Sequence, residues 1–110
     1  MAELVTLIIP AGGSGDRLGA KIPKALVQLG GVTLIERAVN ALSEVADHII
    51  VAAPQGYEDQ FSSLLADSAV VVTGGASRNE SVKAALAYVN ESSKFVLVHL
   101  LVTDISFIKG

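Results

Sequence analysis

Glycine and positive charge are concentrated in one short stretch near the start of the chain. An apolar run is followed directly by Pro10-Ala11-Gly12-Gly13-Ser14-Gly15-Asp16-Arg17-Leu18-Gly19, and Lys21 and Lys24 come soon after it. Glycines let a backbone approach phosphate oxygens without a Cβ in the way, so that its amides can face an anion. The guanidinium of Arg17 and the two ammonium groups supply the charge that a polyphosphate needs. The stretch therefore predicts a polyphosphate-binding loop.

Neither of the two best-known phosphate loops fits this stretch. The Walker pattern ends in glycine, lysine and then serine or threonine, and no glycine of the loop is followed by that pair. The dinucleotide fingerprint fails by one residue, because Leu18 occupies the position of its third glycine and Gly19 follows one residue late. A flexible glycine turn with solvated lysines is the alternative interpretation.

A second pair of glycines follows the third apolar run. Gly74 and Gly75 lead into Ser77 and Glu80, whose spacing is that of a capping box at the start of a helix. The amides at such a start converge at the positive end of the helix, where a ligand can be held. This arrangement predicts a second ligand contact that includes Arg78. The alternative is a tight strand-to-helix turn in which Ser77 serves only as a cap and Arg78 is solvated.

Four short apolar runs, rich in valine or isoleucine and largely continuous, must position these loops. They are typical of strands buried on both faces of a parallel sheet, and they span residues 4–10, 48–53, 69–72 and 95–98. Helical spacing is found between them, at 34–45, around Phe61, Leu64 and Leu65, and at 82–89. Thr33 and Glu36 have capping-box spacing at the start of the first of these helices.

This order of elements predicts a three-layer α/β fold with a mostly parallel sheet and right-handed crossovers. Ligands in such folds bind beyond the C-terminal ends of the strands, where both glycine pairs lie. Residues 10–31 contain no helical stripe, and so long a loop in a compact domain is usually functional. We therefore expect this segment to contribute to a site.

Composition restricts the classes of protein to which the chain can belong. Its 110 residues are 51% hydrophobic and 17% charged, which suits one domain or part of one. A net charge of -3 provides no broad basic field, so we expect no nucleic-acid partner. The absence of cysteine excludes disulfides and thiolate zinc sites. The acidic start and the short apolar run at 4–10 predict a cytoplasmic protein without signal peptide or membrane span.

Both glycine motifs, together with Ile22-Pro23-Lys24 and Leu29-Gly30-Gly31, resemble those of the 2-C-methyl-D-erythritol 4-phosphate cytidylyltransferases. The resemblance implies a Rossmann-like nucleotidyltransferase fold whose first loop wraps the triphosphate of CTP. It implies that Arg17 and Lys24 stabilise phosphate charge as catalytic residues, and that the second motif lies around the cytosine base. The nucleotide-binding residues implied are Ala11, Gly12, Gly13, Gly15, Gly75, Ala76, Arg78 and Ser81. Ala76 stands where the family often has an acidic residue.

The resemblance stops at Leu100, where the family continues with an aspartate that binds the magnesium bridging the triphosphate. We therefore interpret residues 1–99 as the N-terminal nucleotide-binding part and 100–110 as an atypical tail, with the fold incomplete at its C-terminus. A truncation or frame shift explains such a tail, and the alternative is a divergent protein that pairs it as an extra strand. Magnesium is expected for the family, but its aspartate ligand is absent here and no metal ligand is assigned. The dimer arm of the family's second half is also missing.

By this resemblance the reaction is transfer of CMP from CTP to 2-C-methyl-D-erythritol 4-phosphate in non-mevalonate isoprenoid biosynthesis. The partners implied are CTP and a polyol phosphate, and the family forms homodimers. We expect this chain to be a truncated and inactive form. Two alternatives stay open: a ribitol-5-phosphate cytidylyltransferase, whose substrate residues belong to the absent half, and a nucleotide-binding module without catalysis.

Overall fold

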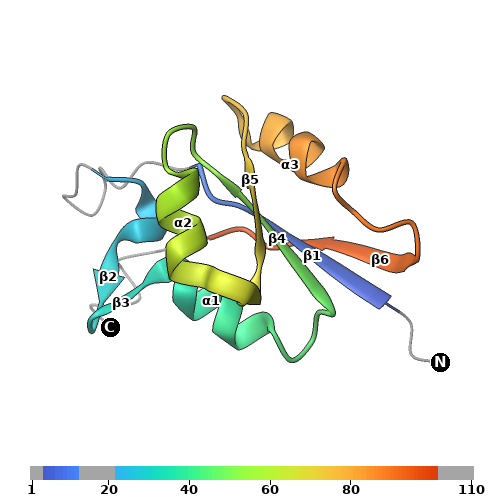
Figure 1. Ribbon diagram of the computed structural model, residues 1–110, viewed down its shortest axis with the longest axis horizontal. Helices are drawn as coiled ribbons and strands as arrows, with labels where there is room; N and C mark the ends of the chain where they lie inside the picture. Colours follow the sequence, from blue (N-terminus) through green and yellow to red (C-terminus); the bar gives the residue numbers. More distant parts are fainter. Residues whose placement is uncertain (1–3, 13–21, 102–110) are drawn as a thin grey trace, which may run out of the picture.

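A four-stranded parallel sheet forms the centre of the computed structural model, which describes residues 4–12 and 22–101 (Figure 1). The strand order is β5-β4-β1-β6, and every neighbouring pair is parallel. The strands are β1 (Leu4–Pro10), β4 (His48–Ala53), β5 (Val70–Thr73) and β6 (Ser93–Val98). All four predicted strands are confirmed, and their C-terminal ends lie at one edge of the sheet.

Three α-helices connect these strands, and all three were predicted from apolar spacing: α1 (Leu34–Leu42), α2 (Glu58–Leu65) and α3 (Arg78–Leu86). At the start of α1 the Thr33 hydroxyl accepts from the Glu36 amide, and the Glu36 carboxylate accepts from the Thr33 amide, which completes the capping box. At the start of α3 the Ser77 hydroxyl accepts from the Glu80 amide at 3.1 Å. The Ser77 hydroxyl also donates to the Glu80 carboxylate. At Thr33 the backbone amide of the capping residue also donates to the glutamate carboxylate.

The sheet has an apolar core on each face, because successive side chains of a strand point to opposite sides. Leu7 and Ile9 of β1 pack with α1 and α2, whose buried anchors include Ile35 and Phe61. Ile8, between them in sequence, packs on the other face with residues of β4, β5 and α3. Figure 1 shows α1 and α2 on one side of the sheet and α3 on the other. The three-layer Rossmann-like α/β prediction is confirmed.

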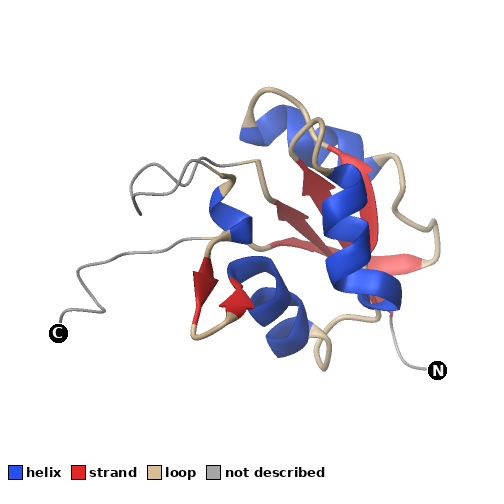
Figure 2. Cartoon of the chain, turned by 60° about the vertical axis from the view of Figure 1, so that its left-hand side comes forward, coloured by secondary structure: helices blue, strands red, loops and turns tan. Residues whose placement is uncertain are grey.

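The segment that precedes α1 is more regular than the sequence predicted. Residues 24–33 form a 3-10 helix, η2 (Lys24–Leu26), and an antiparallel hairpin of β2 (Gln28–Leu29) and β3 (Val32–Thr33). The expectation of a continuous loop over 10–31 is therefore wrong from Lys24 onward. Gly30 and Gly31 form the hairpin turn with φ of 65° and 83°, values that favour glycine. Figure 2 shows the two short strands standing apart from the main sheet.

The two edge strands differ from the prediction that every strand is buried on both faces. In β5, Val70 is 54% exposed, and within that strand only Val72 is buried. Phe95, Val96, Leu97 and Val98 of β6 are 39–50% exposed. The physical reason is position: in the described part of the chain β6 pairs only with β1, and the two helical layers pack on the other three strands. A further 3-10 turn, η3 (Ala66–Ser68), follows α2. None of the described helices combines the length and apolar character needed to cross a membrane.

Candidate functional site

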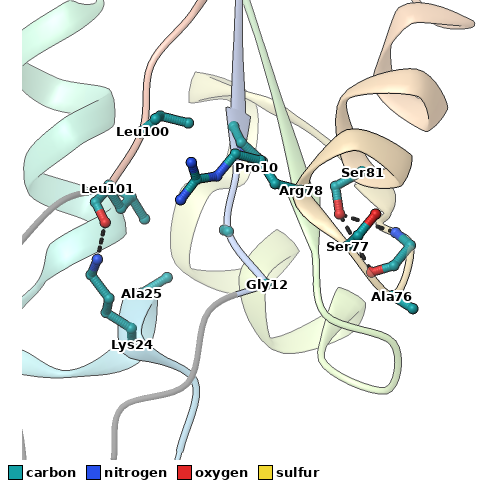
Figure 3. Close-up of a pocket in the computed structure, with 12 residues that line it drawn as sticks. Pro10, Gly12, Lys24, Ala25, Ala76, Ser77, Arg78, Ser81, Leu100 and Leu101 are labelled. Atoms are coloured by element: carbon teal, nitrogen blue, oxygen red, sulfur yellow. Dashed lines mark hydrogen bonds between the residues drawn. The ribbon is translucent and has the colours of Figure 1, made fainter. Parts of the chain in front are cut away.

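A cavity of about 290 Å³ opens at the C-terminal edge of the sheet, between the end of β1, η2 and the start of α3. This volume is at the low end of the range for small-molecule sites, roughly 300–1,000 Å³. Segments far apart in sequence meet there, as Figure 3 shows. The lining residues are Pro10, Ala11, Gly12, Lys24, Ala25, Gly75, Ala76, Ser77, Arg78, Ser81, Leu100 and Leu101.

Lys24 enters the cavity from η2, which is anchored on both sides. Pro23 before it is buried, and Ala25 and Leu26 after it are 1% and 4% exposed within the core beneath α1. The Leu26 amide donates to the Pro23 carbonyl at 2.9 Å and closes the 3-10 turn. The backbone of Lys24 is therefore held in place while its side chain, partly buried, reaches the cavity. Its ammonium group donates to the carbonyl of Leu101, drawn as a dashed line in Figure 3.

The turn between β5 and α3 requires its glycines for packing. The Gly74 amide donates to the Ala53 carbonyl at 2.7 Å, which ties the turn to the end of β4. A Cβ on Gly74 would lie 2.8 Å from the Ser81 hydroxyl and 3.1 Å from the Ala53 carbonyl oxygen. A Cβ on Gly75 would lie 2.3 Å from the Cβ of Glu80. Larger residues at either position would therefore push the turn away from β4 and α3.

Ser81 was predicted to contact the base, but its hydroxyl already has partners within the protein. The side chain is 2% exposed, and its Oγ accepts from the Gly75 amide at 3.1 Å and lies 3.5 Å from the Gly75 carbonyl. Ser81 lines the cavity all the same. In this structure Ser81 fixes the backbone of the turn, because its hydroxyl is hydrogen-bonded to the Gly75 amide.

Arg78 is the first residue of α3 and is exposed. In Figure 3 its side chain extends from the helix start past Pro10, at the end of β1, toward Leu100. Gly75 to Ser77 precede it at the positive end of the helix dipole. The cavity thus has an ammonium group on one wall, and a guanidinium and a helix start on the other. This arrangement of positive charge suits an anionic ligand.

The structure brings together most of the residues predicted from the sequence. Seven of them line the same cavity: Ala11, Gly12, Lys24, Gly75, Ala76, Arg78 and Ser81. The other three, Gly13, Gly15 and Arg17, lie outside the described residues. No described residue lies within 4 Å of the position of a Cβ on Gly12, so in this part of the structure Gly12 leaves space open on the cavity wall. Sequence reasoning missed Pro10, Ala25, Ser77 and Leu101 as lining residues, although Ser77 was singled out as a cap.

The wall formed by Leu100 and Leu101 is apolar apart from its backbone. Leu101 also packs partly against the core beneath α1 and α2. None of the described residues that line the cavity carries a carboxylate. Across residues 4–12 and 22–101 no three histidine, aspartate or glutamate side chains are grouped so that they could hold a metal ion. Magnesium prefers oxygen ligands, so the described residues of this site do not fit the ion that the family resemblance implies.

Comparisons with known proteins identify the family of the chain. The sequence profile of the family described as 2-C-methyl-D-erythritol 4-phosphate cytidylyltransferase matches residues 5–101. A protein of that name from Rhodococcus opacus (strain B4) is 43% identical over 97 residues, which cover 86% of this chain and 42% of that protein. The chain therefore spans less than half the length of this curated relative.

Solved structures give the same result. The 2-C-methyl-D-erythritol 4-phosphate cytidylyltransferase of Thermus thermophilus is 34% identical with a TM-score of 0.65, and the match covers 89% of this chain and 41% of that one. The inositol-1-phosphate CTP transferase of T. maritima shares the fold, with a TM-score of 0.74 at 18% identity over 91% of this chain and 44% of that one. The family match over residues 5–101 and these relatives show that the chain belongs to the 2-C-methyl-D-erythritol 4-phosphate cytidylyltransferase family.

Proposed function

We propose that the cavity at the C-terminal edge of the sheet binds CTP, and that the chain is the nucleotide-binding part of a 2-C-methyl-D-erythritol 4-phosphate cytidylyltransferase. The observation that carries this proposal is that Lys24 and Arg78 line one cavity together with Gly12 and Gly75, one glycine from each motif. Family membership supports the choice of nucleotide and of polyol phosphate.

Charge supports a phosphate ligand in a protein that is acidic overall. The net charge is -3, yet Lys24 and Arg78, the ionisable side chains among the described residues that line the cavity, are both cationic. Lys24 is close to a point charge, and Arg78 offers a planar fork of donors. Phosphate oxygens are the ligand groups that both recognise well. The Gly12 wall would let the ligand approach the backbone closely.

In the family's reaction an oxygen of the polyol phosphate attacks the α-phosphorus of CTP. A new phosphorus–oxygen bond forms, the bond to the β-phosphate breaks, and pyrophosphate leaves. The protein contributes alignment and stabilisation of charge, with no covalent intermediate. Lys24 would hold the phosphate groups from the η2 side, and the turn at Gly75 would orient the nucleoside.

We further propose that this 110-residue chain binds CTP without turning it over. The wall at Leu100 offers no carboxylate, so a metal ion that neutralises the triphosphate has no ligand there. The Leu101 carbonyl also competes for the Lys24 ammonium group. The lack of a carboxylate at Leu100 favours a nucleotide-binding module over a catalyst in this form, whereas a bound nucleotide would have to displace the Leu101 carbonyl from Lys24. A ribitol-5-phosphate cytidylyltransferase is not favoured by any described residue.

Calorimetric titration of CTP into the purified chain tests binding. Lys24→Ala should weaken the affinity by roughly tenfold or more, because a charge-assisted hydrogen bond contributes about 1.5–3 kcal/mol. Lys83→Ala is the matched control, since Lys83 lies on α3 without lining the cavity. Arg17→Ala should act like Lys24→Ala if the first glycine loop reaches the phosphates. Equal affinities for wild type, Lys24→Ala and Lys83→Ala would reject the site.

Base selectivity is tested separately. Arg78→Ala should narrow the preference for CTP over UTP and ATP, because Arg78 lies beside the turn assigned to the base. The measurement is a competition titration with the three nucleotides. An unchanged preference ratio would show that Arg78 contacts phosphate alone or does not contact the ligand.

Turnover is tested by pyrophosphate release from CTP and 2-C-methyl-D-erythritol 4-phosphate in the presence of magnesium. No release above background is expected from the 110-residue chain. Leu100→Asp alone should not restore it, because one ligand does not rebuild the polyol phosphate site. Magnesium-dependent release that Lys24→Ala abolishes would show that the chain is a working enzyme.

A further inference from the structure

The carboxylate of Glu58 joins the ends of two neighbouring strands, close to the cavity but outside it. Its Oε1 accepts from the Gly56 amide at 2.8 Å, in the loop that leaves β4. Its Oε2 accepts from the Thr73 hydroxyl at 2.7 Å, at the last residue of β5. Glu58 does not line the cavity. Any effect of Glu58 on a ligand therefore acts through Thr73 and the turn that follows it.

Glu58 is well placed for this link because its own backbone is fixed. It is the first residue of α2, where a negative charge suits the positive end of the helix. The preceding loop is a tight turn in which the Tyr57 amide donates to the Pro54 carbonyl at 3.0 Å, and Gly56 has a φ of 93°. Phe61, three residues further along α2, is completely buried and anchors the helix in the core.

Thr73 in turn precedes the Gly74–Gly75 segment, which forms part of the cavity wall. That segment has two other anchors: the Gly74 amide donates to Ala53, and the Gly75 amide donates to Ser81. These bonds hold the turn on its β4 and α3 sides. The Thr73 bond to Glu58 adds a third support, from α2, at the point where the strand ends and the turn begins.

We propose that Glu58 is a positioning residue that acts through Thr73 to hold the Gly74–Gly75 turn in its nucleotide-binding geometry. The inference rests on the proposed function of the cavity. The same hydrogen bonds explain why the Glu58 carboxylate can lie near a site for an anion. One oxygen accepts from the Gly56 amide and the other from the Thr73 hydroxyl. Both bonds are solvent-exposed, so their effect is local order and not global stability.

A double-mutant cycle on CTP affinity tests the link. Glu58→Ala and Thr73→Val each remove the same bond from opposite ends, and each should weaken CTP binding by about threefold to tenfold. The double variant should bind CTP no more weakly than the single variant with the lower CTP affinity, because all three variants lose the same Thr73–Glu58 hydrogen bond. Glu58→Gln should restore part of the affinity, since an amide can still pair with the Thr73 hydroxyl. Asp59→Ala, the next residue of α2, is the control and should bind like wild type.

Hydrogen exchange without nucleotide provides a readout that global destabilisation would not imitate. Glu58→Ala should speed exchange of the Gly74 and Gly75 amides by about threefold or more, with Tm close to that of wild type. Additive affinity losses in the double variant, or unchanged exchange at both glycines, would overturn the proposal. If wild type fails to bind CTP, the proposed function is wrong. The exchange data then still decide whether Glu58 holds the turn.

Discussion

Alanine at the two cavity glycines should affect stability at Gly75 but hardly at Gly12. In Gly75→Ala the new Cβ would lie 2.3 Å from the Cβ of Glu80 and 3.2 Å from its carbonyl carbon. Carbon atoms normally touch at about 3.5–4.0 Å, so the first contact is short by roughly 1.2 Å or more. Neither of these Glu80 atoms is the end of a flexible side chain. The turn or the start of α3 must therefore move.

Such overpacking typically costs about 1–3 kcal/mol. In a domain of about 100 residues each kcal/mol corresponds to about 4–8 °C, so Gly75→Ala should lower Tm by at least about 4 °C. In Gly12→Ala no described residue lies within 4 Å of the added Cβ, so stability should change by no more than about 0.5 kcal/mol. Both variants should weaken CTP binding, Gly12→Ala because its methyl group occupies the open cavity wall.

Thermal unfolding followed by circular dichroism measures the first effect, and calorimetric titration of CTP measures the second. Gly75→Ala should therefore lower both Tm and CTP affinity, whereas Gly12→Ala should lower CTP affinity alone. If Gly75→Ala unfolds at the wild-type temperature, the packing between the turn and α3 is not as described. If Gly12→Ala binds CTP as wild type does, the ligand does not approach that wall.

Three further results are expected. Thr33→Ala removes the capping box of α1 and should lower the free energy of unfolding by about 1 kcal/mol in urea denaturation; an unchanged midpoint would contradict the cap. The Thr73 hydroxyl, with the amides of Glu58 itself and of Gly56, holds the pKa of Glu58 below its ordinary value. The carboxylate therefore keeps the Thr73 bond above the pKa of an unfolded glutamate, about 4.3, and loses it only as the pH falls through the lower folded value. An NMR titration of the Glu58 carboxyl group should give a midpoint below that of an unfolded glutamate, Thr73→Val should raise this midpoint, and an unchanged midpoint would refute the reasoning. An exposed apolar edge strand favours pairing with a second copy, so the chain should associate as its concentration rises, and Leu97→Lys should reduce this in sedimentation velocity because Leu97 is 50% exposed on β6; equal association of the variant would mean that β6 is not the contact.

Local signals in the sequence determined the helices and the four strands of the sheet. The caps at Thr33 and Ser77 were readable because each bond joins residues three positions apart, and strands were readable because parallel strands in a core must be apolar. The hairpin at 28–33 was missed. Its signal, two glycines flanked on each side by one apolar residue, was present in Leu29-Gly30-Gly31-Val32, but the glycine-rich loop before it concealed the signal.

Sequence also determined most of the candidate site, because parallel strands bring the residues that follow them to one edge of the sheet. Only the tertiary structure decided which atoms meet there. Lys24 and Leu101 are 77 positions apart, and Glu58 and Thr73 are 15 apart, so strand order and helix packing create both contacts. The same packing directs the Ser81 hydroxyl to Gly75, and the position of β6 beyond the helical layers leaves its apolar side chains exposed. Contacts of this kind depend on how whole elements pack, and no local pattern of residues encodes them.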